Sequence, residues 1–390
     1  AAPESCMTST PPGLPGRVRS VDILRGAVVV LMAIDHVRVY SALPAGGPEF
    51  GIFFTRWITH FCAPAFVFLA GTSAWFYGQR HSDLRRFLVI RGIWLIALEL
   101  TVLRVAWTFN FGFGRYNMAG VIWVIGWSMI ALAALSRLPV RLLGALSVLV
   151  IAAHNLLPMP YGTESALLKL VYVGFFSDPI GGDGTPTLVV LYTFIPWVAV
   201  MAAGYAFGAV LALEPARRDR LCLRIGLGAV ALFLVLRGLN LYGDPAPWSA
   251  SGEMPALLSF LNSSKYPASF LFLLMTLGPT IALVPPLERA RGVLARALET
   301  FGRVPFFYYV IHIPLIHLLA IVVSQVRLGH VSPWLFADHP MGVGDAPDGY
   351  QWTLWQLYVV WAIAIGILYV ACRRYAAFKA ARSYWWLKYV

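Results

Sequence analysis

Residues 17–40 of this 390-residue chain read RVRSVDILRGAVVVLMAIDHVRVY, an apolar run long enough to cross a lipid bilayer as a helix. Ionisable residues interrupt the run near both ends: Asp22 and Arg25 close to its start, and the neighbours Asp35 and His36 close to its end. Such groups are costly inside a membrane, and where they occur they usually mark a substrate path or a reactive site. The stretch therefore predicts a transmembrane helix with a polar face.

The spacing of these residues places three of them on that face. Arg25 and His36 point in directions that agree to within about 20°, and Asp22 lies about 40° from His36. Along the helix axis Arg25 and His36 are roughly 16 Å apart, about half the hydrocarbon thickness of a membrane. A polar stripe thus leads from one membrane surface into the opposite half of the bilayer. The alternative is that these groups only reach to headgroups or bind neighbouring side chains.

The composition indicates a polytopic membrane protein. Hydrophobic residues make up 59% of the chain and charged residues 12%, and the mean hydropathy is +0.71. The formal net charge of +12 comes from short basic clusters between apolar segments, which indicates membrane topology and excludes a nucleic-acid-binding patch. The four cysteines are scattered singly, so neither a disulfide framework nor a metal site is indicated.

The fold class predicted is all-α, a bundle of about ten transmembrane helices. The segments are 21–41, 57–78, 87–108, 119–137, 140–157, 187–212, 221–240, 266–284, 304–325 and 353–372.

The connections between these segments alternate in charge. Arginine and lysine concentrate in one set of connections, and the positive-inside rule assigns this set, together with both termini, to the cytoplasm. The basic connections are residues 79–86, 136–141, 214–220 and 288–296. The other set is rich in Gly, Pro, Asp and aromatic residues and is expected to face outward. The domains expected are an N-terminal cytoplasmic tail (1–20), a transmembrane domain (21–372) and a basic C-terminal cytoplasmic tail (373–390). This topology places Arg25 near the cytoplasm and His36 in the outer half of the membrane.

Polar residues of other segments converge on the level of His36. Arg56 and His60 share one helix face, Glu99 and Arg104 lie in the third segment, and Lys265 opens the eighth. Because each would be costly in lipid, we expect them to surround a hydrated cavity. The alternative is a set of local ion pairs, such as Glu99 with Arg104, that hold helices together.

Three stretches resemble known membrane acyltransferases. The Arg-x10-His spacing in LRGAVVVLMAIDH (24–36) is similar to the first-helix motif of acyltransferase-3 proteins. RSVDILRG (19–26), HFCAPAFVFLAGTSAW (60–75) and FGRVPFFYYVIH (301–312) resemble the bacterial branch of the heparan-α-glucosaminide N-acetyltransferase family, the DUF1624 group. The resemblance extends over nearly the whole chain.

This resemblance implies that acetyl-CoA or another acyl-CoA enters from the cytoplasm, that the acyl group reaches a histidine in the membrane, and that a carbohydrate or glycolipid outside accepts it. No metal is implied. In the lysosomal branch the position matching His36 is asparagine, and the catalytic histidine lies in the loop before the second helix. Here that loop, residues 41–57, contains no histidine, and Glu49 is its nearest ionisable group. His36 and His60 therefore both remain candidates.

Acyl transfer needs a base or a nucleophile that carries the acyl group, and imidazole can serve as either. Adjacent helix residues diverge by 100°, so Glu99 or Glu49 is a better orienting partner for His36 than Asp35. Arg25 is too far from His36 to touch the same small group and suits the phosphates or pantetheine of the donor, with Arg91 and its basic neighbours at the nucleotide end. The candidate catalytic residues are His36, His60, Asp35 and Glu99, and the candidate substrate-binding residues are Arg25, Asp22, Arg56, Trp123, Lys265, Tyr266 and His312.

Two other classes stay open. A transporter of a small polar substrate also places polar residues within a membrane, although no internal repeat is evident. A non-catalytic relative would bind lipid or a partner protein. Paired membrane histidines can bind haem, but no CxxCH motif is present. The expected location is a bacterial inner membrane, as a multi-pass protein in contact with lipid, with no nucleic-acid partner and with a homodimer as one option.

Overall fold

The computed structural model describes residues 18–160, 162–174, 178–182, 185–338, 346–382 and 384–388. Each of the ten predicted segments contains a helix. In chain order these are α1 (Arg19–Ser41), α2 (Phe50–Trp57) with η1 (Ile58–Phe61) and α3 (Cys62–Gly78), α4 (Leu84–Leu98) with η2 (Glu99–Leu103) and α5 (Arg104–Thr108), α6 (Val121–Leu135), α7 (Val140–Ala153), α9 (Phe194–Leu211), α10 (Pro215–Gly238), α12 (Phe270–Ala282), α15 (Pro305–Leu328) and α16 (Leu354–Ala381).

Six helices in the described part of the chain are long and apolar enough to cross a membrane: Phe50–Gly78, Phe194–Leu211, Pro215–Gly238, Phe270–Arg289, Pro305–Leu328 and Leu354–Ala381. α1 is not among the six because it carries five charged residues near its two ends, Arg19, Asp22, Arg25, Asp35 and Arg38. The chain is thus a helical membrane protein. The count of ten crossings and the cytoplasmic placement of both termini stay predictions.

Shorter elements occupy the connections. They are α8 (Ala166–Leu168), α11 (Ala256–Leu261), α13 (Val284–Arg289), α14 (Val293–Arg303), β1 (Tyr116–Ala119), β2 (Ile180–Gly182) and β3 (Thr185–Val190). The prediction of helix from residue 187 was wrong for residues 187–190, which belong to β3. β-Branched residues favour a strand there, and β3 pairs parallel with β1 and antiparallel with β2.

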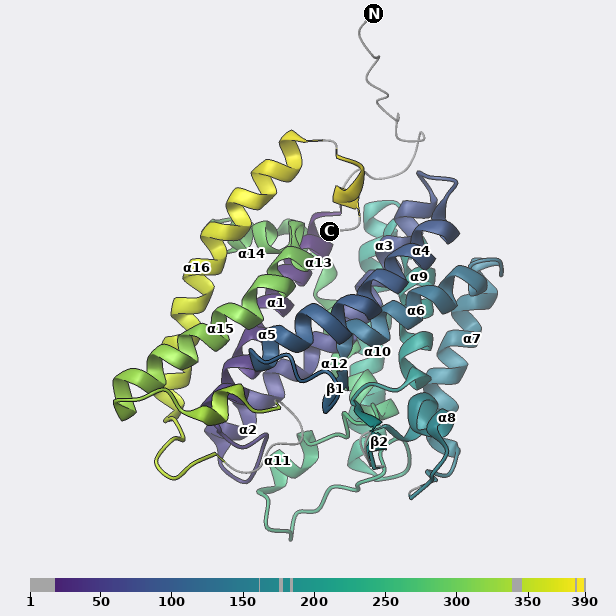
Figure 1. The fold of residues 1–390 in the computed structure, drawn as a ribbon. Coiled ribbons are helices and arrows are strands. Elements are labelled where there is room, and N and C mark those ends of the chain that lie inside the picture. The colour runs from purple at the N-terminus through teal and green to yellow at the C-terminus, as the bar shows by residue number, and fades with distance from the viewer. Residues whose placement is uncertain are drawn as a thin grey trace, which may run out of the picture.

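The short elements gather at the two ends of the bundle. Figure 1 shows α13 and α14 at one end, and α2, α8, α11 and β2 at the other. α13 and α14 share the basic stretch of residues 288–296, whereas the other four elements lie in the connections that carry little positive charge. The arrangement agrees with the alternation of charge along the sequence.

α1 runs through the bundle and packs against α3, α13, α14, α15 and α16. At its start, Arg19 donates a hydrogen bond to Glu299 of α14, 2.9 Å long. Although burial raises the pKa of Glu299, hydrogen bonds from Arg19 and Arg303 lower it below its ordinary value. The carboxylate therefore stays charged and links α14 to the first turn of α1.

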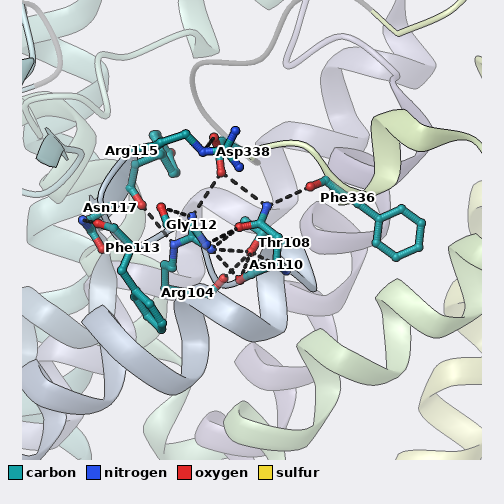
Figure 2. Close-up of polar contacts among 10 residues, drawn as sticks. Arg104, Thr108, Asn110, Gly112, Phe113, Arg115, Asn117, Phe336 and Asp338 are labelled. Atoms are coloured by element: carbon teal, nitrogen blue, oxygen red, sulfur yellow. Dashed lines mark hydrogen bonds and ion pairs between the residues drawn. The ribbon is translucent and has the colours of Figure 1, made fainter. Parts of the chain in front are cut away.

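At the opposite end, Arg104 fixes the loop after α5. The side chain is buried and donates to the carbonyl oxygens of Tyr116 at 3.0 Å, Asn110 at 2.7 Å and Gly112 at 2.8 Å, and to Asp338 at 3.1 Å. Figure 2 shows Asn110, Gly112 and Asp338 around the guanidinium of Arg104. Arg104 thus binds Asp338 in place of the suggested partner Glu99, and it ties the 109–119 loop to the segment after α15.

Two helices come into direct backbone contact where α3 meets α9. A Cβ atom added at Gly71 would overlap the backbone of Met201, and one added at Gly204 would overlap the backbone of Phe68. Small residues allow such approach, which favours association of helices inside lipid.

We expect Gly204→Ala to destabilise the protein by about 1–3 kcal/mol, the usual cost of overpacking, because the obstacle is backbone and cannot rotate away. Thermal unfolding of the purified protein in detergent measures the effect. Gly228→Ala in α10 is the matched control, since the space around Gly228 is open. Equal melting temperatures for the two variants would contradict the close α3–α9 packing.

Candidate active site

A cavity of about 820 Å³ lies where the predicted polar residues converge. Its walls come from the second half of α1, from α2, η1 and α3, from Glu99, and from the loops before α6 and α12. The predicted site residues that line it are Asp35, His36, Arg56, His60, Glu99, Lys265 and Tyr266.

Four other predicted residues lie elsewhere. Asp22 is buried 3.9 Å from Arg25, and Arg25 lines a different cavity. Trp123 stacks on Phe194, with 5.3 Å between ring centroids. His312 is fully buried and reaches the large cavity only through His36.

The contact between His36 and His312 joins α1 to α15. The Nδ1 atom of His36 lies 2.6 Å from Nε2 of His312, and Nδ1 of His312 lies 2.6 Å from the carbonyl oxygen of Tyr309. A carbonyl oxygen only accepts hydrogen bonds, so Nδ1 of His312 carries a proton. A second proton, on Nε2, would make His312 a buried cation. No carboxylate among the described residues forms a hydrogen bond with His312, so this cation would be costly. Nε2 of His312 therefore accepts.

This chain of hydrogen bonds fixes the tautomer of His36. Since His312 accepts at Nε2, His36 must donate from Nδ1, and in the neutral ring of His36 the Nε2 atom then keeps its lone pair. The ring also packs edge-on against Trp107, with centroids 4.9 Å apart, which restricts its orientation. An imidazole with one free lone pair at a cavity wall can act as a base or as a nucleophile.

Asp35 binds two arginines rather than His36. Its Oδ1 accepts from Arg38 and its Oδ2 from Arg56, each at 2.8 Å. This agrees with the prediction from helix geometry that the side chains of Asp35 and His36, as adjacent residues, point in different directions. The predicted orienting carboxylate is replaced by His312, because the ring of His36 hydrogen bonds to that histidine.

Glu99 lies at the first residue of the π-helical segment η2, a type of helix distortion that is frequent at functional sites. The backbone N–H groups of Ile122 and Trp123, at the start of α6, interact with its carboxyl group. Its Oε2 atom has no hydrogen-bond partner among the described residues. Gly120 must lack a side chain here, because a Cβ would overlap Oε1 of Glu99.

His60 is the second candidate histidine. It lines the large cavity from η1, and its ring packs edge-on against Phe272 with centroids 5.5 Å apart. Its Nδ1 atom has no hydrogen-bond partner in the part of the chain that the structure describes. Unlike His36, it therefore lacks a group that fixes its tautomer.

A second cavity, of about 310 Å³, lies toward the end of the bundle that carries α14. Four basic side chains line it, those of Arg25, Arg91, Arg303 and Lys379. Much of the remaining wall is apolar.

The two cavities meet at a shared wall. Phe66 of α3, Val121 of α6 and Tyr309 of α15 line both of them. Arg25 therefore lies on one side of this wall and His36 on the other, so the polar face of α1 contributes one residue to each cavity.

Sequence reasoning missed part of both cavities. Lys379 belongs to the basic C-terminal tail, whose only visible signal was topology, and Arg303 lies in FGRVPFFYYVIH, a stretch that carried the resemblance but gave Arg303 no role. Tyr192 and Trp334 line the large cavity from connections with no distinguishing motif. Among the described residues, no group of three or more His, Cys, Asp or Glu side chains is arranged to hold a metal ion.

The chain was compared with protein families and with curated proteins. The family model of the heparan-alpha-glucosaminide N-acetyltransferase catalytic region matches residues 17–242. That range includes His36, His60 and Glu99, and it ends before Lys265 and α15. No curated protein matches the chain.

We expect nitrogen-15 NMR of histidine-labelled protein in lipid nanodiscs to show His36 with a proton on Nδ1 and none on Nε2. The His36 signal is assigned by its loss in His36→Gln. His312→Leu removes the acceptor and should mix the two tautomers, whereas His312→Gln offers a carbonyl oxygen and should preserve the wild-type form. A proton on Nε2 of His36 in the wild type would contradict the assignment.

Proposed function

Because the chain belongs to the heparan-alpha-glucosaminide N-acetyltransferase family, we propose that it is an integral membrane acetyltransferase that moves an acetyl group from cytoplasmic acetyl-CoA to a sugar or glycolipid acceptor at the outer face. The observation that carries the proposal is the pair of adjoining cavities, one basic and one containing His36. In the predicted topology these open toward opposite sides of a bacterial inner membrane.

The smaller cavity is the proposed donor site. Its four cations suit the phosphates of CoA, since arginine and lysine bind phosphate through charge-assisted hydrogen bonds. The guanidinium of Arg91 lies over the rings of Phe87 and Phe306, 5.9 and 5.7 Å from their centroids, which holds it at the wall. Arg25 donates to the hydroxyl of Ser73 and to the carbonyl oxygen of Leu69, deeper in the same site. The pantetheine arm would then extend toward Phe66 and Tyr309.

In the larger cavity, Nε2 of His36 accepts a proton from the hydroxyl or amine of the acceptor. The acceptor oxygen or nitrogen forms a bond to the thioester carbon, the C–S bond breaks, and the proton held by His36 passes to the CoA thiolate. The same lone pair could instead attack the thioester and carry the acetyl group for one step. In both routes His312 holds the His36 ring in place, so that the lone pair meets the acceptor's proton in the first route and the thioester carbon in the second.

We expect His36→Gln to lower acetyl-CoA turnover by purified protein about 100-fold or more, the usual contribution of a positioned base. Release of free CoA thiol, with and without added sugar acceptors, measures the rate. His330→Gln is the control, because His330 is exposed and does not line either cavity. Full activity in His36→Gln would transfer the role to His60, and absence of turnover in the wild type would favour a transporter or a non-catalytic relative.

We expect Arg91→Gln to raise the KM for acetyl-CoA about 10- to 100-fold with a smaller change in kcat, since one charged hydrogen bond to a phosphate is worth roughly 1.5–3 kcal/mol. Arg137→Gln removes the same charge from an exposed site that lines neither cavity, and it should leave the KM unchanged. Unchanged KM in Arg91→Gln would argue against this cavity as the donor site.

A further inference from the structure

Lys265 is a buried cation that faces the larger cavity. It lies in the connection between α11 and α12, lines that cavity, and is 8% exposed. Its ammonium group lies over the ring of Tyr266, 5.0 Å from the centroid, and no carboxylate of the described residues lies within salt-bridge distance. A charge buried without a counter-ion is costly. Its presence implies that a negative group joins it when the cavity is filled.

The remaining charges of the cavity do not supply that negative group. Asp35 acts electrostatically on Lys265, but only from beyond salt-bridge distance, and it already forms ion pairs with Arg38 and Arg56. Glu99 interacts with the start of α6 rather than with these cations. Even with Glu99 ionised, the three basic side chains of the wall outnumber its two carboxylates.

Tyr266 brings two of the cations to one place. Its ring carries Lys265 on its face, and its hydroxyl oxygen lies 3.5 Å from Nη2 of Arg56. The ring of Tyr192 packs edge-on against it, with centroids 5.5 Å apart. Trp57 and Trp334 also line the cavity, and aromatic faces of this kind suit the apolar faces of a sugar.

We infer that the acceptor is an anionic saccharide or glycolipid whose phosphate or carboxylate group binds between Lys265 and Arg56. This inference rests on the proposed function, because it names the acceptor class for the same cavity. The phosphates of the donor are the other source of negative charge, but the second cavity has four cations of its own.

Binding of small probes to purified protein in detergent tests the inference, with the fluorescence of the cavity tryptophans as the signal. The probes are D-glucose 6-phosphate, D-glucuronate and neutral D-glucose. We expect the better of the two charged probes to bind at least about tenfold more tightly than glucose. If glucose 6-phosphate is the better one, the anionic group of the acceptor is a phosphate; if glucuronate is the better one, it is a carboxylate. Lys265→Gln should reduce the ratio to about twofold or less, and Lys265→Arg should retain most of it.

Two controls test whether the preference for charged probes depends on the charge at position 265. Arg115→Gln removes an exposed positive charge from the same end of the bundle and should retain the wild-type ratio. A salt series on the wild type needs no variant: affinity for the charged probe should fall between about 50 mM and about 500 mM NaCl, whereas affinity for glucose should not.

Equal affinity of the wild type for charged and neutral sugars would overturn the inference. A loss of binding of 3′,5′-ADP, the nucleotide end of CoA, in Lys265→Gln would also overturn it, because Lys265 would then belong to the donor site. Either result leaves the proposed function intact if the wild type still turns over acetyl-CoA. Conversely, selective binding of the charged sugars by a wild-type protein that does not turn over acetyl-CoA would support the anion site and remove the proposed function.

Discussion

The hydrogen bond between His36 and His312 is the interaction on which the site depends. It joins the central helix α1 to α15, and its direction is set by the carbonyl oxygen of Tyr309 behind it. A lone imidazole in a membrane cavity could place its proton on either nitrogen. The second imidazole removes that freedom and leaves the lone pair of His36 at the cavity wall, so the packing of two helices determines which atom can react.

The same constraint, that a charge within a membrane needs a partner, explains the rest of the arrangement. Asp35 is satisfied by Arg38 and Arg56, and Arg104 is satisfied by loop carbonyl oxygens and Asp338. Asp35 and Arg104 hold walls in place and have no capacity left for other ligands of opposite charge, whereas Arg56 shares its only carboxylate in the described part of the chain with Arg38 and faces the cavity. Lys265 differs because no carboxylate of the described residues lies within salt-bridge distance of it. It is therefore the side chain of the cavity beside which we expect an anionic ligand.

The positions of the long helices could be predicted from the sequence because hydrophobic length and basic connections are local signals. The cavity could also be anticipated, since Arg56, His60 and Lys265 occur near segment ends of one kind and Glu99 lies within the third segment. The hydrogen-bond and ion-pair partners of these residues could not be predicted from the sequence. The helical spacing excluded Asp35 as the partner of His36, but nothing in the sequence pairs residue 36 with residue 312. The strand β3 was missed because an apolar run leading into a helix reads as part of that helix.

We propose that the donor spans the shared wall at Phe66 and Tyr309 and presents its thioester to His36. Cryo-electron microscopy of the protein with a non-hydrolysable acetyl-CoA analogue tests this directly. We expect density for the nucleotide beside Arg91 and Lys379, with the thioester in the larger cavity on the side of Nε2 of His36. Density for the nucleotide in the larger cavity, or a thioester carbon directed away from His36, would contradict it.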